Sequence, residues 1–385
     1  MTRVIPSFET FQRIVHRQQL TLRIIGCDLF DVNFKISATT VCIFFLASLF
    51  MTISLIDLYL FRDNIFEFIF VLVTFFYGVI GCGRLGFLLT HSSIASKLLI
   101  EAKLTYEQTS HEDCEQKVLI RYTNILKHCA MLFKTVFLGA SALTMLLPLI
   151  IFFINGSRIL PFGVVLPFTD PESVEGYRIN YIYQVSCALW TPPGLTASQN
   201  MYFALVFNVC IQYDLLILKL RDLDDLINHN DDGMPDADIH QKIIDIIQRQ
   251  QQLINFVTNI EKLYAKPTLI EVVSNGLQIV MTLFVLHVDF WMPGYFIMII
   301  ATFQLLLSCF LGTLIDMKSE LFTKEIYNLS WNLMKTSDQK TLKFMLAKSQ
   351  RSLMLSCGGM MTLNMNLFLN VYKKIYSIFM MLQNM

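Results

Sequence analysis

Charged residues are scarce in this sequence of 385 residues. Asp, Glu, Lys and Arg make up 16% of it and hydrophobic residues 54%, whereas roughly a quarter of an ordinary soluble domain is charged. The 32 phenylalanines outnumber the 30 lysines and arginines. Since no soluble core needs so much apolar surface, the composition excludes a water-soluble enzyme and predicts a multi-pass α-helical membrane protein.

Catalytic and metal-binding motifs are also missing. The sequence contains no HExxH, GxSxG or GxxxxGK[ST] motif, so nothing in it indicates an enzyme. Its nine cysteines are dispersed and no two form a CxxC pair, which argues against a metal site, a cofactor site and a disulfide scaffold. Acidic and basic residues balance at 30 each, and this balance gives no reason to expect a nucleic-acid partner.

Seven stretches of low charge are long enough to cross a bilayer, which takes about 17–25 residues. The fourth is too long for one straight helix, and Pro192-Pro193-Gly194 is expected to break it. A helix should then start near Thr196 and leave residues 179–189 as a separate outer piece. No signal-peptide pattern occurs in the first 35 residues, so the first span is expected to target the chain. The predicted spans are residues 36–61, 65–89, 128–154, 179–218, 267–288, 293–315 and 352–383.

The distribution of lysine and arginine predicts the orientation of these spans. The amino-terminal segment and every second connection together hold 23 of the 30 basic residues, and the alternate connections hold three. Because basic residues accumulate on the cytosolic side, we expect a cytosolic amino terminus and an extracellular carboxyl terminus. Asn155-Gly156-Ser157 is then a candidate glycosylation site in an outer loop.

Two segments on the expected cytosolic side have helical apolar patterns. In residues 238–266 the apolar positions follow a heptad rhythm interrupted by Gln250, and Pro267 is expected to end the helix. Such a stripe fits either a helix of another subunit or a neighbouring helix of the same chain. Residues 319–348 show a second stripe, with a break expected near 336–338. Both segments should extend the spans below the membrane.

The last span contains two lysines in an otherwise apolar stretch. Lys373 and Lys374 would lie roughly 17 Å from its outer end. A charge at this depth usually faces protein or water. Lys373 shares one helical face with Tyr376, Ser377, Met380, Gln383 and Asn384. This face fits a wet pathway with a narrow apolar gate, and a buried helix whose lysines pair within the bundle fits as well.

The carboxyl-terminal third contains a series of short motifs. These are Ser319-Glu320-Leu321, Ile326-Tyr327, Trp331, Ser349-Gln350-Arg351, Gly358-Gly359, Leu363, Phe368, Lys373 and Tyr376-Ser377. Through them the sequence resembles the insect odorant receptor family. Earlier parts resemble this family in layout, with seven spans, an inverted topology and Gln212 followed by Leu216 at the inner end of span four.

The resemblance implies a ligand-gated, non-selective cation channel made of four subunits. In this family an odorant-specific subunit combines with a common olfactory co-receptor, and the last helix of each subunit lines the pore. The co-receptor's long intracellular insert is missing from this sequence, which implies the odorant-specific subunit. The expected location is the plasma membrane of the olfactory sensory neuron dendrite, in contact with membrane lipid.

The same resemblance assigns parts of the chain. Residues 1–35 form a cytosolic segment, 36–315 the first six spans with the odorant-binding bundle, 316–352 a cytosolic anchor helix and 353–385 the pore helix. By position Met380 matches the hydrophobic gate residue, although the family usually has a compact β-branched residue there. The rest of the expected pore face is Lys373, Tyr376, Ser377, Gln383 and Asn384. Subunit contacts are expected at Ile243, Gln250, Leu253, Val257, Tyr327 and Trp331.

By resemblance, the odorant site lies in the outer half of spans two, three, four and six. Aromatic and methionine-rich walls with a few hydroxyls suit a small, volatile, mostly apolar ligand, and ordinary helix packing would give the same spacing. The expected residues are Phe70, Val73, Thr74, Tyr77, Ser141, Ala142, Met145, Met201, Tyr295, Phe296, Ile299 and Phe303.

Two alternatives remain open. A gustatory-type homotetrameric channel carries a terminal Thr-Tyr-x5-Gln-Phe signature, of which this chain keeps only the spacing to Gln383. A G-protein-coupled receptor would need an outer amino terminus, which the basic residues contradict. A transporter is disfavoured because no internal repeat is evident.

Overall fold

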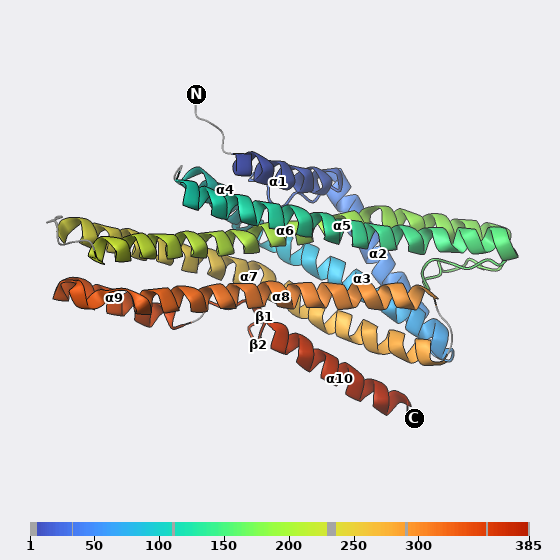
Figure 1. The fold of residues 1–385 in the computed structure, drawn as a ribbon. Helices are drawn as coiled ribbons and strands as arrows, with labels where there is room; N and C mark the ends of the chain where they lie inside the picture. Colours follow the sequence, from blue (N-terminus) through green and yellow to red (C-terminus); the bar gives the residue numbers. More distant parts are fainter. Residues whose placement is uncertain are drawn as a thin grey trace.

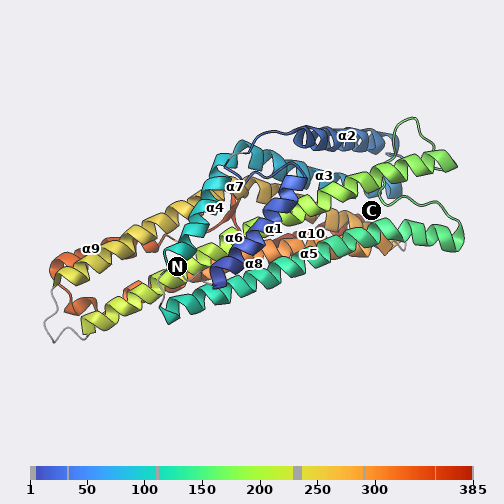
Figure 2. The same cartoon turned by 90° about the horizontal axis from the view of Figure 1, so that it is seen from above.

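The computed structural model describes residues 6–32, 34–109, 112–228, 236–288, 292–351 and 353–383, which form a bundle of long helices (Figures 1 and 2). The predicted all-α class is confirmed. The elements in chain order are α1 (Pro6–Ile24), α2 (Ala38–Leu60), α3 (Ile65–Thr90), α4 (Ser92–Glu107), α5 (Asp113–Asn155), α6 (Val174–Asn228), α7 (Asp236–Val288), α8 (Met292–Asn328), the 3-10 turn η2 (Trp331–Leu333), α9 (Thr336–Ser349), β1 (Ser356–Cys357), β2 (Met361–Thr362) and α10 (Met365–Gln383).

Six of the described helices have the length and hydropathy of membrane spans, namely α2, α3, α5, α6, α7 and α8. The seventh is α10, which is shorter and carries Lys373 and Lys374. In Figure 1 the start of α1 and the whole of α9 lie toward the left of the bundle, whereas the α2–α3 turn, the α5–α6 loop and the end of α10 lie toward the right.

Helix α6 runs without interruption through Pro192-Pro193-Gly194, so the predicted break and the separate outer piece are wrong. The prolines leave the carbonyls of Ala188 and Leu189 without their usual donors. Packing makes this tolerable, because residues 195–211 are all buried and α6 contacts α1, α5, α7 and α8. The Thr196 hydroxyl also donates to the carbonyls of Pro192 and Pro193 (2.9 Å each).

The expected helix end at Pro267 is also wrong, since α7 continues through it. Buried residues lie on both sides of the proline, including Leu263 and Tyr264 before it and Glu271 and Val272 after it. Neighbouring helices therefore hold the two halves in line although one backbone hydrogen bond is missing.

The carboxyl-terminal region differs from the prediction in its boundaries. Helix α8 continues to Asn328, across the expected division at residue 315, and the break before α9 falls at 329–335, earlier than expected. The last helix starts at Met365, because a β-hairpin with Gly358 (φ +66°) and Gly359 (φ +75°) at its turn precedes it. These positive φ values suit glycine and end the preceding regular structure.

The amino-terminal segment, for which no helix was predicted, contains α1. Its apolar face packs on the bundle through Phe11 and Val15, which are fully buried. The Phe11 ring stacks on Tyr106 of α4, with ring centroids 4.4 Å apart. The chain then turns at Gly26, whose carbonyl accepts a hydrogen bond from Thr40 near the start of α2.

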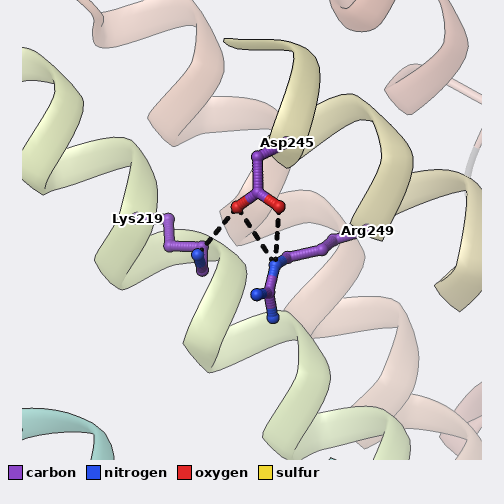
Figure 3. Close-up of polar contacts among 3 residues, drawn as sticks. All are labelled: Lys219, Asp245 and Arg249. Carbon is purple, nitrogen blue, oxygen red and sulfur yellow. Dashed lines mark hydrogen bonds and ion pairs between the residues drawn. The ribbon is translucent and has the colours of Figure 1, made fainter. Parts of the chain in front are cut away.

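At the end of the bundle that contains α9, an ion pair between Lys219 and Asp245 joins α6 to α7, and Arg249 of α7 pairs with the same carboxylate (Figure 3). Lys219 Nζ lies 2.8 Å from Asp245 Oδ2, and Arg249 Nε lies 3.1 Å from the same oxygen. Partial burial raises the pKa of Asp245, but the hydrogen bonds from Lys219 and Arg249 outweigh it, so the pKa lies below its ordinary value.

We expect Asp245→Asn to reduce stability by less than about 1 kcal/mol, because 43% of the Asp245 side chain is exposed. A lowered pKa means that the ion pairs stabilise the fold above the ordinary Asp value of about 3.9 and lose their effect as the pH falls through the folded-state pKa. The difference from wild type should therefore be constant from pH 5 to 8 and decrease only in stronger acid. Thermal unfolding in detergent measures it, with Asp222→Asn, an exposed site on α6, as control. A difference that changes near neutral pH would contradict this assignment.

Candidate functional site

A cavity of about 390 Å³ lies among α2, α3, α5, α6 and α8. It follows α3 from Phe70 to Leu88, which is about 27 Å of helix. The residues of α3 that line it include Phe70, Val73, Thr74, Tyr77, Gly81, Cys82, Arg84, Leu85 and Leu88. A polar group is present at intervals, but most of the wall is apolar, as is usual for a site that binds a small apolar molecule.

Buried side chains fix the loop over one end of the cavity. Three backbone N–H groups of the loop between α5 and α6 donate hydrogen bonds of 2.7–2.8 Å to these side chains. Val165 donates to Asp57 of α2, and Phe162 and Leu166 donate to Gln184 and Asn180 of α6, respectively. Pro161 and Phe162 of this loop line the cavity. The loop is therefore held in one place by neutral and charged acceptors on α2 and α6.

The other end of the cavity is closed by the end of α1 and the turn after it. Leu22, Ile25, Leu29 and Phe30 line this end, and all four are buried. The cavity thus reaches from the α5–α6 loop to the amino-terminal segment. It extends well beyond the outer half expected from the sequence.

Five of the twelve expected ligand-binding residues line this cavity: Phe70, Val73, Thr74, Tyr77 and Ser141. The other seven do not. Ala142 lies on the exposed side of α5, the Met145 carbonyl accepts from Tyr181 at 2.7 Å, and Met201 is fully buried in the core.

The four expected residues of α8 also lie outside the cavity. Tyr295 and Ile299 are 42% and 56% exposed on the outer surface of the bundle, Phe296 is half-buried, and Phe303 packs on Phe133 with ring centroids 6.3 Å apart. The α8 residues that do line the cavity are Ile297 and Ile300. The face of α8 that helical spacing selected is therefore not the one that lines this cavity.

Sequence reasoning missed several parts of the wall. They include parts of residues 43–50 of α2, parts of residues 187–198 of α6 and the turn at 25–30. The treatment of Pro192-Pro193 as a helix end concealed the second part, since it placed residues 187–189 outside the bundle. For α2 and the turn, no local signal in the sequence distinguishes a cavity wall from a lipid-facing surface.

One face of α10 is exposed over most of its length. Lys373, Tyr376, Ser377, Met380 and Gln383 are exposed, whereas Leu367 and Ile375 on the opposite side are buried. The buried side contacts α7 and α8, and Gln383 Nε2 lies 3.3 Å from His287 Nε2. Within the described residues no ion pair engages Lys373 or Lys374, which disfavours lysines paired inside the bundle. Asn384 lies outside the described residues.

The heptad stripe of α7 packs within its own chain. Ile243, Leu253 and Val257 are 1–2% exposed and belong to the main core, and Gln250 is 6% exposed. These four residues are therefore unavailable as subunit contacts, because α6, α9 and other helices of the same chain already cover the stripe. Tyr327 and Trp331, in contrast, are 70% and 52% exposed.

Comparison with known proteins agrees with this architecture. The profile of the 7tm odorant receptor family matches residues 84–376, which is more than half of the chain. The chain belongs to the insect odorant receptor family. This membership confirms the resemblance noted from the carboxyl-terminal motifs, and it places the protein among receptors and not among enzymes.

Individual relatives of this odorant receptor are distant. Putative odorant receptor 83c of Drosophila melanogaster is 22% identical over 307 residues, covering 77% of each chain. Odorant receptor Or2 of Anopheles gambiae is 24% identical over 294 residues, covering 72% of this chain and 74% of its own. The olfactory receptor OR5 of Machilis hrabei, solved with eugenol, superposes with a TM-score of 0.78 at 12% identity over 98% of this chain and 99% of its own. The last comparison confirms the seven-helix membrane fold.

Proposed function

We propose that this odorant receptor is the odorant-specific subunit of a heterotetrameric, odorant-gated, non-selective cation channel formed with the common olfactory co-receptor. The exposed face of α10 is the observation that carries the proposal. This face carries polar groups and Met380, and its own chain leaves it uncovered. Contact of this face with lipid would be costly, because Lys373 lies at mid-depth. The same face suits a water-filled path surrounded by one helix from each of four subunits.

The cavity supports a small, mostly apolar odorant as the activating ligand. Its wall on α3 is connected to the pore helix by direct packing, since α3 packs on α7 and α7 packs on α10. Val371 of α10 lies 3.8 Å from where a Cβ on Gly276 of α7 would be. To open the channel, the odorant must bind the open arrangement more tightly than the closed one. Met380 would form the apolar constriction, with Gln383 and Asn384 at the outer mouth.

The exposed aromatic residues near the α8–α9 break support contact with other subunits. Tyr327 and Trp331 are large, amphipathic and uncovered, and residues of this kind are enriched in protein interfaces. In the proposal the segment 316–352 anchors the subunits on the cytosolic side. The plasma membrane of the sensory dendrite is the compartment where such a channel would work.

The orientation is tested by glycosylation. Asn155 is the last residue of α5 and is exposed, with Gly156 (φ +70°) capping the helix. We expect glycosidase treatment to increase the gel mobility of the wild type, and Asn155→Gln to abolish this shift. Asn328-Leu329-Ser330 is the matched control, since a cytosolic sequon stays unmodified and Asn328→Gln should change nothing. A glycan on Asn328 would reverse the proposed topology.

Odorant-evoked current in excised outside-out patches tests the function. Cells would express this chain alone, the co-receptor alone or both, and no nucleotide would be supplied. We expect fast cation current that depends on this chain only in the co-expressing cells. Current from this chain alone would indicate a gustatory-type homotetramer. Silent patches together with a slow second-messenger response in whole cells would refute the channel.

A further inference from the structure

The inner part of the cavity contains two buried hydrogen-bond donors that have no partner. Arg84 Nε and Ser198 Oγ make no hydrogen bond, although both side chains line the cavity and only 6% and 5% of these residues are exposed. An unpaired polar atom is costly in any protein interior and more so within a bilayer. A bound molecule with an acceptor atom would remove this cost.

The two donors border the same inner part of the cavity. Helices α3 and α6 both start toward the right-hand end of the bundle in Figure 1. Thr191 of α6 lies 3.9 Å from where a Cβ on Gly81 of α3 would be. Counted from this contact, Arg84 follows after about one helical turn and Ser198 after about two. Arg84 also interacts electrostatically with Tyr202, which lies about one further turn along α6.

The positive charge of Arg84 is already compensated. Arg84 Nη2 forms an ion pair with Glu271 Oε2 of α7, and the two side chains are 7% and 3% exposed. Ser308 of α8 donates to the other carboxylate oxygen at 3.4 Å. Because the pair is neutral, Nε–H is a donor without excess charge, and a ligand carboxylate would bring an uncompensated negative charge into the bundle. The site therefore favours neutral acceptors.

The surroundings of the donors are otherwise apolar. Beyond Gly81 the cavity is lined mainly by aliphatic and aromatic side chains of α1, α3, α6 and the turn after α1, namely Leu22, Ile25, Phe30, Leu85, Leu88 and Leu195. A molecule that fits must therefore present one polar atom at this level and an apolar body elsewhere. A carbonyl oxygen has two lone pairs and can accept from both donors.

We propose that the inner end of the cavity is a subsite for the carbonyl oxygen of a neutral, otherwise apolar ligand such as a ketone, an aldehyde or an ester. Arg84 Nε–H and Ser198 Oγ–H donate to this oxygen, and the apolar body extends toward Tyr77 and Phe70. Neither donor was among the ligand-binding residues expected from the sequence. This assignment rests on the proposed odorant-gated function and adds to it the ligand class and the residues that select it.

The test compares four compounds of equal chain length, a methyl ketone, a methyl ester, an alkane and a carboxylate, by current from cells that also express the co-receptor. The ketone and the ester should be active at concentrations about tenfold or more below those of the alkane and the carboxylate.

Ser198→Ala removes one donor. Arg84→Lys removes Nε–H and keeps a charge beside Glu271. Each should raise the half-maximal ketone concentration about tenfold and leave that of the alkane unchanged.

Ser54→Ala is the matched control, since Ser54 is buried outside the cavity wall and its hydroxyl already donates to the Phe50 carbonyl at 2.8 Å. It should not alter the ratio of ketone to alkane potency. Tyr77 is another cavity residue with a buried, unpaired hydroxyl, and Tyr77→Phe should also leave this ratio unchanged. If Tyr77→Phe alone abolishes the preference, the carbonyl lies two turns further out and the proposal is overturned.

Equal losses for ketone and alkane in Ser198→Ala and Arg84→Lys would also overturn the subsite. Failure of the channel itself is recognised separately, as the absence of current from the wild type with every compound. In that case displacement of a radiolabelled ketone from purified receptor, wild type against Ser198→Ala, still decides the subsite. Unchanged ketone affinity in this variant would contradict it, and about tenfold weaker binding would support it.

Discussion

Arg84→Leu should unfold this receptor or keep it from the cell surface. The substitution leaves the Glu271 carboxylate almost fully buried without its partner. Removing one member of a buried ion pair typically costs about 3–5 kcal/mol, a large share of a total stability of about 5–15 kcal/mol. Surface biotinylation and thermal unfolding in detergent would measure the loss. Glu271→Leu should have a similar effect, because it leaves the guanidinium uncompensated.

The double variant Arg84→Leu/Glu271→Leu separates charge from packing. Replacing both members of a buried pair by apolar residues of similar volume is often neutral or stabilising, so surface expression should return to near the wild-type level. The double variant should nevertheless lose the preference for ketones over alkanes, since the Nε donor is gone. If it is as unstable as the single variants, the ion pair is not the cause of their instability.

Gly312→Ala should strongly reduce odorant-evoked current while much of the protein still folds. A Cβ at this position of α8 would collide with the carbonyl oxygen of Leu363 and lie 3.2 Å from Leu363 Cβ. Forcing an extra methyl group into such a contact typically costs about 1–3 kcal/mol. The relief is a shift of the segment that leads into α10. Current normalised to surface protein should fall at least about tenfold, as expected for a 2 kcal/mol bias against the open state.

Hydrogen bonds hold the hairpin before α10 to α7 and α8, so we expect the shift to be passed on to α10. Leu363 N–H donates to the Leu355 carbonyl (2.8 Å), Gly358 N–H to Ala265 of α7 (2.9 Å) and Met365 N–H to the Thr313 hydroxyl of α8 (2.9 Å). Gly276→Ala is the matched control, because its added Cβ would meet Val371 of α10 at an ordinary 3.8 Å. Normal current from Gly312→Ala, or equal loss from Gly276→Ala, would contradict the expected role of this contact.

Periodicity identified the face of α10 that its own chain leaves exposed, because α10 is a short amphipathic helix with one buried side. Lys373, Tyr376, Ser377 and Met380 recur at helical spacing, and the structure leaves this face exposed while Leu367 and Ile375 pack inward. A charge in an apolar helix is a strong local signal. Its role in conduction stays a prediction.

The cavity could be predicted only in part, for a physical reason. The wall on α3 was found because Phe70, Val73, Thr74 and Tyr77 form a continuous stripe on one helix. The choice of face on α5 and α8 depends on how these helices rotate in the bundle, and one residue of error moves a side chain by about 100°. Residues of α2 and of the turn at 25–30 enter the wall only through tertiary packing.

The errors at Pro192-Pro193 and Pro267 have a common origin. Rules for proline describe a helix surrounded by water, where lost hydrogen bonds end the helix. Within the bundle the neighbours of α6 and α7 keep both sides of each proline in place, and ending the helix would expose more backbone to lipid than it would relieve. The local rule is correct about the missing bonds, and tertiary packing decides whether the helix ends.

The missing bonds of α6 also set its mechanics. A regular helix transmits a tilt along its length as a stiff rod, and prolines make it easier to bend at one point. In α6 this pivot coincides with the cavity, since Pro192 and Gly194 are part of the wall. The arm from Pro193 to Asn228 is about 52 Å long. If a ligand bends α6 at these prolines, a small change of angle at the cavity wall produces the largest displacement at the distant end of the helix. That end lies beyond Asp214, whose carboxylate accepts hydrogen bonds from Tyr122 of α5 and Lys318 of α8.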